Sequence, residues 1–355
     1  MKLKNSFNQI LKSQNFKYIE LDSIIESKHI LKRSGGNFRQ YLFSFYDQNF
    51  REWSLRPDLT ISSVIKFIKE KINNRTKWYY TGEAYRKANI RSNPVIKKQT
   101  GFEIYASNNN NKDDEEIVKT SIKILKKTTF KKAQLNIGNI EIFYALVNRL
   151  EMPNRWKERI KRHFSREVYL NKLLKKLSTN SDINFEVVKQ DKKKAEKLRK
   201  ENPKKIFSGR SLKEILDRFD IKNYSDPRVN SNKKNVKIIR DYLKINLPIK
   251  KTEKAIISFF ANNSLKNTNL NIYLKKINFI NKKLGKKYSI YFKTNFGRNT
   301  EYYTGTVFLA FVKNKSKTIE IARGGEYNNL LKTLGYKKDI PALGGAINLN
   351  QLINL

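Results

Sequence analysis

The sequence contains no cysteine and only two histidines, and these absences exclude several kinds of site. Without cysteine there can be no disulfide, no thiolate nucleophile and no cysteine-ligated zinc or iron–sulfur site. His29 and His163 are far apart in the chain, so a histidine-rich metal site or a Ser-His-Asp triad is hard to build. No apolar run approaches the ~20 residues of a membrane span, and no signal peptide is visible. We therefore expect a cytoplasmic protein with no membrane segment, metal or cofactor.

Acidic residues are also scarce: 32 Asp and Glu against 75 Lys and Arg give a net charge of +43. Such a charge often indicates a nucleic-acid partner or an anionic membrane surface. Here the basic residues are mostly lysine and run through the whole chain, and Asn, Ile, Phe and Tyr are abundant as well. A/T-rich codons encode all five of these residue types. We therefore attribute the charge to codon preference and a solvated surface, and we do not expect a nucleic-acid partner.

What the chain does contain is enough apolar residue to form a core, 39% of 355 residues, in a mixture of helical and strand patterns. Helices are expected at 3–14, 60–72, 113–128, 139–149, 153–164, 211–219, 235–243, 252–284 and 327–334. Strands are expected at 17–21, 40–47, 51–55, 78–88, 98–106, 132–137, 288–293, 302–312 and 318–322. Thr60 and Asn139 are the expected N-caps of two of the helices. Antiparallel strands with helices before, between and after them predict an α+β fold, not a parallel βαβ sheet.

The pattern divides the chain into three parts. Residues 1–165 and 251–355 carry the strands, and residues 166–250 form a predicted helical insertion between them. Within the insertion, residues 192–205 are densely basic. We interpret this run as a solvated helix face.

Four segments of the sequence are informative as an ordered set. They are Leu55-Arg56-Pro57-Asp58-Leu59-Thr60; Tyr80-Thr81-Gly82-Glu83-Ala84-Tyr85-Arg86 with Gln99-Thr100-Gly101-Phe102-Glu103; Arg298-Asn299-Thr300-Glu301-Tyr302-Tyr303-Thr304-Gly305; and Gly324-Gly325-Glu326-Tyr327-Asn328-Asn329-Leu330 ending in Pro341-Ala342-Leu343-Gly344. Their order and spacing resemble the catalytic core of class II histidyl-tRNA synthetases. They resemble even more the paralogue of that core, the regulatory subunit of ATP phosphoribosyltransferase. Residues 139–177 and 208–211 resemble its alphaproteobacterial version.

The same segments depart from the synthetase pattern at phosphate-handling positions. Glu326 stands where the synthetase motif Gly-Gly-Arg-Tyr-Asp has Arg, and Gln351 replaces a phosphate-binding Arg of the last motif. Adenylate formation needs fixed positive charge on the transferring phosphoryl group, so we expect that step to be crippled, with a glutamate near the site. The sequence also stops at Leu355, where synthetases continue into an anticodon-binding domain, and we expect no such domain.

The resemblance implies a pocket for free histidine, and residue types in these segments suit one. Such a ligand presents an ammonium, a carboxylate and an imidazole, which call for acids, an arginine, and hydroxyl or aromatic groups. The eight candidates are Asp58, Gln99 and Glu103 for the ammonium, Arg86 for the carboxylate, Arg298, Tyr302 and Tyr303 for the imidazole, and Thr60 as a further hydroxyl. Simpler roles remain open for some residues. The two tyrosines could be packing residues, Glu103 could face solvent, and Arg56 could pair with a neighbouring carboxylate.

The resemblance implies a non-catalytic regulatory subunit in the first step of histidine biosynthesis. Members of that family assemble with the short-form catalytic ATP phosphoribosyltransferase into a hetero-octamer and transmit feedback inhibition by L-histidine, which is a linkage effect. The alternative is a diverged enzyme that still activates histidine or a related acid with ATP. A third hypothesis, an RNA-binding synthetase-like protein, is supported only by the charge.

Overall fold

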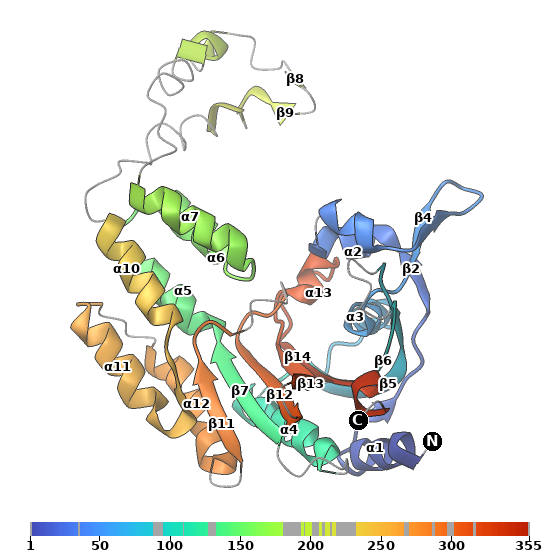
Figure 1. The fold of residues 1–355 in the computed structure, drawn as a ribbon. Helices are drawn as coiled ribbons and strands as arrows, with labels where there is room; N and C mark the ends of the chain where they lie inside the picture. The colour runs from blue at the N-terminus through green and yellow to red at the C-terminus, as the bar shows by residue number, and fades with distance from the viewer. Residues whose placement is uncertain are drawn as a thin grey trace. The chain divides into compact units, whose positions relative to one another are not determined.

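The structure is a computed structural model, shown in Figure 1. It describes residues 2–34, 36–87, 95–108, 110–126, 133–179, 193–194, 196–200, 206–207, 210–213, 215–217, 232–265, 270–285, 288–296, 302–314 and 317–353. The chain forms two compact units. The first comprises residues 1–142, 245–257 and 268–355, and the second comprises residues 143–244 and 258–267. The three-part division at residues 166 and 250 stays a prediction.

The first unit is built on a nine-stranded mixed sheet, whose strands lie side by side in Figure 1. Its strands, in spatial order, are β1 (Lys17–Tyr18), β5 (Thr76–Tyr85), β6 (Ile96–Tyr105), β14 (Ala342–Asn348), β13 (Lys317–Glu326), β12 (Thr306–Asn314), β7 (Ala133–Asn139), β11 (Ser289–Lys293) and β10 (Asn246–Pro248). Neighbouring strands are antiparallel except β1 with β5 and β11 with β7. The predicted α+β class is confirmed.

Helices pack on both faces of this sheet. The helices of the first unit are α1 (Lys2–Ser13), α2 (Ser27–Ser34), α3 (Leu59–Lys69), α4 (Asn110–Leu125), α12 (Leu270–Leu284), α13 (Leu330–Thr333) and α14 (Leu349–Ile353), with 3-10 turns η1 (Gly36–Tyr41) and η2 (Ile249–Lys251). Helix α3 contacts β5 and β6, whereas α4 contacts β12, β13, β14 and α12. The hydroxyl of Ser63 on α3 accepts a hydrogen bond from Tyr105, which is on the face of β6 opposite to Ile104. We call the face covered by α3 the α3 face and the other the α4 face.

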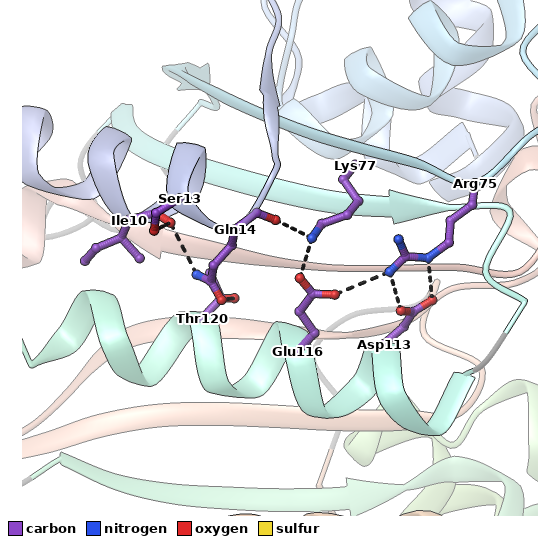
Figure 2. Close-up of polar contacts among 8 residues, drawn as sticks. All are labelled: Ile10, Ser13, Gln14, Arg75, Lys77, Asp113, Glu116 and Thr120. Atoms are coloured by element: carbon purple, nitrogen blue, oxygen red, sulfur yellow. Dashed lines mark hydrogen bonds and ion pairs between the residues drawn. The ribbon is translucent and has the colours of Figure 1, made fainter.

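A polar network attaches α4 to the edge of the sheet (Figure 2). Arg75, next to the start of β5, donates to Asp113 at 2.6 Å and to Glu116 at 3.3 Å. The ammonium of Lys77 lies between Glu116 and the backbone carbonyl of Gln14, at the end of α1. Hydrogen bonding to Asp113 raises the pKa of Arg75. Because carboxylates near the beginning of a helix also favour its dipole, the acidic first turns of α4 are held against the basic strand end.

A small sheet accompanies the large one in the first unit. It contains β2 (Ile24–Glu26), β4 (Glu52–Leu55) and β3 (Ser44–Tyr46), all antiparallel. The hairpin predicted from the alternation in 40–47 and 51–55 is therefore confirmed, although the first residues of that stretch form η1.

The second unit is mostly helical in the part that the structure describes. It contains α6 (Asn154–Arg162), α7 (Glu167–Thr179), α10 (Asn232–Leu243), most of α5 (Ile140–Arg149) and the end of α11 (Thr252–Asn262), together with two-residue strands β8 (Ile206–Phe207) and β9 (Arg210–Ser211). Its core combines aliphatic side chains with aromatic rings: Phe143 stacks on Phe164 at 4.3 Å between ring centroids, and its ring centroid lies 6.0 Å from that of Tyr242. In the basic run 192–205, residues 193–194 and 196–199 are helical and mostly exposed, as expected, residue 200 is an exposed turn, and the other residues of the run lie outside the described ones.

Several local predictions can now be judged. The side chain of Asn139 caps α5 by accepting from the amide of Ile142 at 3.1 Å, as predicted. Thr60 was the wrong cap for α3, because Asp58 has the extended cap conformation and accepts from the amide of Ile61. The expected helix 252–284 is two helices, α11 and α12. No described helix is long and apolar enough to span a membrane.

Candidate ligand pocket

Glu103 on β6 is the centre of a buried polar cluster on the α3 face. Its side chain accepts hydrogen bonds from Thr60 at 3.0 Å, from Tyr80 at 2.5 Å and from Tyr327 at 2.5 Å. Thr60 comes from α3, Tyr80 from β5, and Tyr327 directly follows β13. We call these four residues the Glu103 cluster. Since Glu103 is only 1% exposed, the alternative that it faces solvent is wrong.

Two glycines make room for this cluster. A Cβ on Gly344, the cross-strand neighbour of Glu103, would lie 1.4 Å from the carboxyl Oε2. A Cβ on Gly101 would lie 2.3 Å from the ring of Tyr80. Glycine is therefore sterically required at 344 by the buried acid and at 101 by its phenol partner Tyr80.

Burial has a large electrostatic effect on Glu103. Desolvation raises the pKa of its carboxyl from 4.5 to about 8, although the three hydroxyl donors oppose the rise and Asp58 adds to it. Burial also raises the pKa of Tyr80 and Tyr327 well above 10. At neutral pH the free Glu103 is thus mainly protonated. A cationic group brought to it would favour the ionised form.

Asp58 and Arg86 form a second pair beside the beginning of α3. While one oxygen of Asp58 caps the helix, the other lies 3.6 Å from the guanidinium of Arg86. Arg86 also donates from Nε to the carbonyl of Pro57 at 2.8 Å, and its guanidinium lies 5.6 Å from the centre of the Phe38 ring. The Arg86 side chain keeps 39% of its surface exposed, which leaves donors available to an anionic group.

Tyr302 and Tyr303 lie in a turn before β12, not in the strand as predicted. The ring of Tyr302 stands perpendicular to that of Tyr327, with 5.8 Å between centroids, so it borders the Glu103 cluster. Tyr303 is 8% exposed and lies 4.7 Å from Tyr302, which fits the packing role. Burial raises the pKa of Tyr303 well above its usual value.

The remaining two candidates are less closely placed. Gln99 is half-buried on β6, and strand alternation puts it on the same face as Gly101 and Glu103. Arg298 lies outside the described residues. The structure therefore joins Thr60 and Glu103 directly and places Tyr302 next to them.

Three further residues on the α3 face were not among the candidates. Tyr80 and Tyr327 belong to the motifs above, and only the fold shows that their hydroxyls converge on one acid. Arg323 on β13 is paired with Ala346 of β14, hence on this face, and forms two 2.7 Å bonds with Glu320. Burial lowers the pKa of Arg323, but these bonds and the charge of Glu320 raise it overall. The sequence signal that could have identified Arg323 is its position directly before Gly324-Gly325.

Among the residues that the structure describes, no carboxylate forms an ion pair with Arg56, contrary to the simpler alternative. Its guanidinium is bonded to backbone carbonyls, those of Glu83 at 2.7 Å and Leu21 at 2.6 Å among them. A Cβ on Gly82 would lie 2.5 Å from this guanidinium. Arg56 is thus a buried residue that links the segments around Leu21 and Glu83 by hydrogen bonds.

Glu326 does not belong to the Glu103 cluster, and its expected closeness to a phosphate site stays a prediction. It is the cross-strand neighbour of Leu343, whereas Glu103 neighbours Gly344, so the two carboxyls project from opposite faces of the sheet. On the α4 face Glu326 accepts two hydrogen bonds from Lys276 of α12, at 2.8 and 2.9 Å.

Comparison with known proteins places this geometry in a family. Residues 1–220 and 208–352 match the family model described as histidyl-tRNA synthetase. The ATP phosphoribosyltransferase regulatory subunit of Caldanaerobacter subterraneus subsp. tengcongensis is 25% identical over 354 residues, covering 99% of this chain and 77% of that protein. The protein of the same name from Allorhizobium ampelinum is 24% identical over 349 residues, covering 94% and 92%.

Solved structures share the fold. An ATP phosphoribosyltransferase regulatory subunit/histidyl-tRNA synthetase from Bacillus halodurans superposes with a TM-score of 0.65 at 16% identity, covering 99% of this chain and 78% of the other. Apo histidyl-tRNA synthetase from S. aureus gives 0.55 at 18% identity, covering 99% and 68%. The resemblance predicted from the four segments is confirmed, and the chain belongs to the histidyl-tRNA synthetase family.

Proposed function

We propose that this chain is a non-catalytic regulatory subunit of ATP phosphoribosyltransferase, needed for the first step of L-histidine biosynthesis. One observation carries the proposal. The α3 face keeps a buried acid with its polar partners, while Gln351 and Glu326 stand where a synthetase has arginines. Such a site retains the means to recognise a ligand and lacks the fixed positive charge that phosphoryl chemistry needs. Relatives that align over nearly the whole chain carry the regulatory-subunit name.

A module of this kind acts through another chain. We expect its partner to be the short-form catalytic subunit, in a hetero-octamer in the cytoplasm. A stable interface of this kind buries ~1,200–2,000 Å² or more. The net charge of +43 would also speed association with an acidic partner at low salt.

The effector in this proposal is L-histidine, bound on the α3 face. Glu103 and Asp58 face its ammonium, Arg86 its carboxylate, and Tyr302 the side of its imidazole. A ligand that prefers one conformation of the assembly shifts the catalytic subunit toward that conformation, by an amount equal to its difference in affinity.

The test is reconstitution from two purified chains. Size-exclusion chromatography at moderate salt should show the catalytic chain eluting earlier when mixed with this one, and phosphoribosyl transfer should change in rate and become sensitive to histidine. If the catalytic chain elutes unchanged and its rate ignores this protein, the proposal is wrong. The diverged ATP-dependent enzyme would then be the leading hypothesis.

A further inference from the structure

A buried ion pair lies on the α4 face, beneath the strand that leads to the candidate pocket. Glu326 at the end of β13 is 1% exposed, and the side chain of Lys276 is 10% exposed. Two other carboxyls surround the ammonium of Lys276. Glu141 lies 3.6 Å away, and the carboxyl of Asp114 on α4 interacts electrostatically with both Glu326 and Lys276.

Three carboxyls thus interact with one ammonium, and their different environments shift their pKa values in different directions. Burial raises the pKa of Asp114 well above its usual value and also raises that of Glu141. Burial acts on Glu326 in the same direction, but Lys276 and the hydrogen bonds lower its pKa overall. Of the three carboxyls, Glu326 is therefore the one that most readily ionises beside Lys276, and Asp114 is the one that most readily keeps a proton.

Glu326 also forms hydrogen bonds with the turn that precedes β12. Its side chain accepts from the amide of Thr306 at 3.1 Å, and its backbone carbonyl accepts from the amide of Thr304 at 2.8 Å. Between these two residues, a Cβ on Gly305 would lie 2.7 Å from the Glu326 carboxyl. Only glycine allows the turn to approach the acid so closely.

Asn328 completes the attachment from the other side. Its amide N–H donates to the hydroxyl of Thr304 at 3.0 Å, and its side chain donates to Glu326 at 3.4 Å. The side-chain oxygen accepts from the amide of Ala342 at 3.1 Å, which ties the arrangement to β14. Glu326 and Asn328, which stand at the Arg and Asp positions of the Gly-Gly-Arg-Tyr-Asp motif, therefore act together on residues 304–306.

Residues 304–306 directly follow Tyr302 and Tyr303. Tyr302 contacts Tyr327, whose hydroxyl donates to Glu103. An unbroken series of contacts thus leads from Lys276 on the α4 face to the Glu103 cluster on the α3 face.

We propose that Lys276 and Glu326 are positioning residues that hold the 302–306 turn and so place Tyr302 at the ligand pocket. This inference rests on the proposed histidine site. It makes α12 the element through which an event on the far face of the sheet changes histidine affinity.

The test compares two lysine–glutamate pairs of the α4 face, each with a largely buried lysine side chain, in the whole 355-residue chain. Lys276→Met removes the proposed clamp. Lys77→Met is the matched control, because the Lys77 side chain is 12% exposed and pairs with Glu116, without a contact to residues 302–306. Hydrogen exchange of a peptide covering 302–308 reports on the turn, and calorimetry reports on L-histidine binding.

In Lys276→Met, exchange in 302–308 should be about tenfold faster and histidine binding about tenfold weaker, the scale of a lost hydrogen bond to a charged group. Lys77→Met should leave both unchanged, and Lys276→Arg should restore both. Equal effects from the two Met variants, or unchanged exchange at 302–308 in Lys276→Met, would reduce the pair to a general stabilising role and overturn the proposal.

The proposal can still be tested if the Lys276→Met variant fails to fold or if the protein binds no histidine. If Lys276→Met does not fold, Glu326→Gln takes its place. Because the amide can still accept from Thr306 but no longer pairs with an ammonium, exchange in 302–308 should still rise severalfold, and no rise overturns the proposal. If the unaltered protein binds no histidine, the proposed effector site fails, while the exchange comparison still decides whether Lys276 holds the turn.

Discussion

Glu103 and Glu326 make an instructive comparison, because both carboxyls are 1% exposed and they project from opposite faces of one sheet. Glu103 is surrounded by neutral hydroxyls, and its pKa rises to about 8. Glu326 faces the ammonium of Lys276, and its pKa is lowered. Equal burial thus leads to opposite pKa shifts, because the neutral donors around Glu103 offset the cost of removing a carboxylate from water only in part, whereas the ammonium beside Glu326 adds enough to reverse it.

The largest test of this difference is the pH dependence of stability. The pKa of the Glu103 carboxyl is 4.5 when unfolded and about 8 when folded. Between these values the folded state holds a proton that the unfolded state has released, so this contribution to stability is complete below pH 4.5 and is lost as pH rises to about 8. A shift of this size corresponds to at most about 5 kcal/mol.

The measurement is urea denaturation of the unaltered protein and of Glu103→Gln at pH 5 and pH 8. The variant cannot titrate at this position, so its loss of stability over the interval should be smaller by several kcal/mol. Because Asp114 and Glu141 titrate in both proteins, the difference isolates Glu103. Equal pH profiles would mean that Glu103 is ionised at neutral pH.

The second test breaks the ion pair from each side. Lys276→Met leaves Glu326 buried without its cation and should cost ~3–5 kcal/mol of unfolding free energy. Glu326→Ala should cost less, because Asp114 can ionise and pair with Lys276 in its place. Urea denaturation at pH 7 gives both values. A greater cost for Glu326→Ala would contradict the opposite directions of the two pKa shifts, upward for Asp114 and downward for Glu326.

The third test concerns binding on the Glu103 face. Glu103→Ala should weaken histidine binding by ~2–5 kcal/mol, because it leaves the ligand ammonium unpaired. Arg86→Ala should weaken it less, since the Arg86 side chain is 39% exposed. Arg51→Ala, an exposed arginine of the β3–β4 hairpin, is the control. Calorimetry in two buffers of different ionisation enthalpy should also show proton release on binding near pH 7, and unchanged affinity in both variants would remove these residues from the site.

A smaller loss of stability is expected when the glycine next to each acid is replaced by alanine. Gly344→Ala would place a methyl group against Glu103, and Gly305→Ala would place one against Glu326. Overpacking of this kind costs ~1–3 kcal/mol. Thermal unfolding should show both losses, but only Gly344→Ala should alter the pH profile described for Glu103.

The last prediction is that the chain has no adenylate-forming activity. The purified chain should show no histidine-dependent exchange of pyrophosphate with ATP above background, because Gln351 supplies no positive charge for phosphoryl transfer. Gln351→Arg is the informative variant, since one restored arginine should still give no exchange. Activity in the unaltered protein would support the diverged-enzyme alternative.

Local signals predicted the features that depend on short stretches of chain. Asn139 before a helical pattern indicated a cap, and alternation on both sides of the residue 47–51 turn indicated a hairpin. The prediction of Thr60 as the cap of α3 was wrong: Thr and Asp are both common N-cap residues, so the sequence alone did not distinguish Thr60 from Asp58. Thr60 is instead inside α3, where its hydroxyl meets Glu103.

By itself, the sequence determined the α+β class, the family and the candidate acid Glu103, since these depend on periodicity and on an ordered set of motifs. Only the tertiary structure decided which groups surround each acid. Whether Glu103 meets phenols or Glu326 meets an ammonium depends on strand register, because a shift of one residue moves a side chain to the other face. The partners come from distant segments, Tyr327 for Glu103 and Lys276 for Glu326, and no local pattern links them.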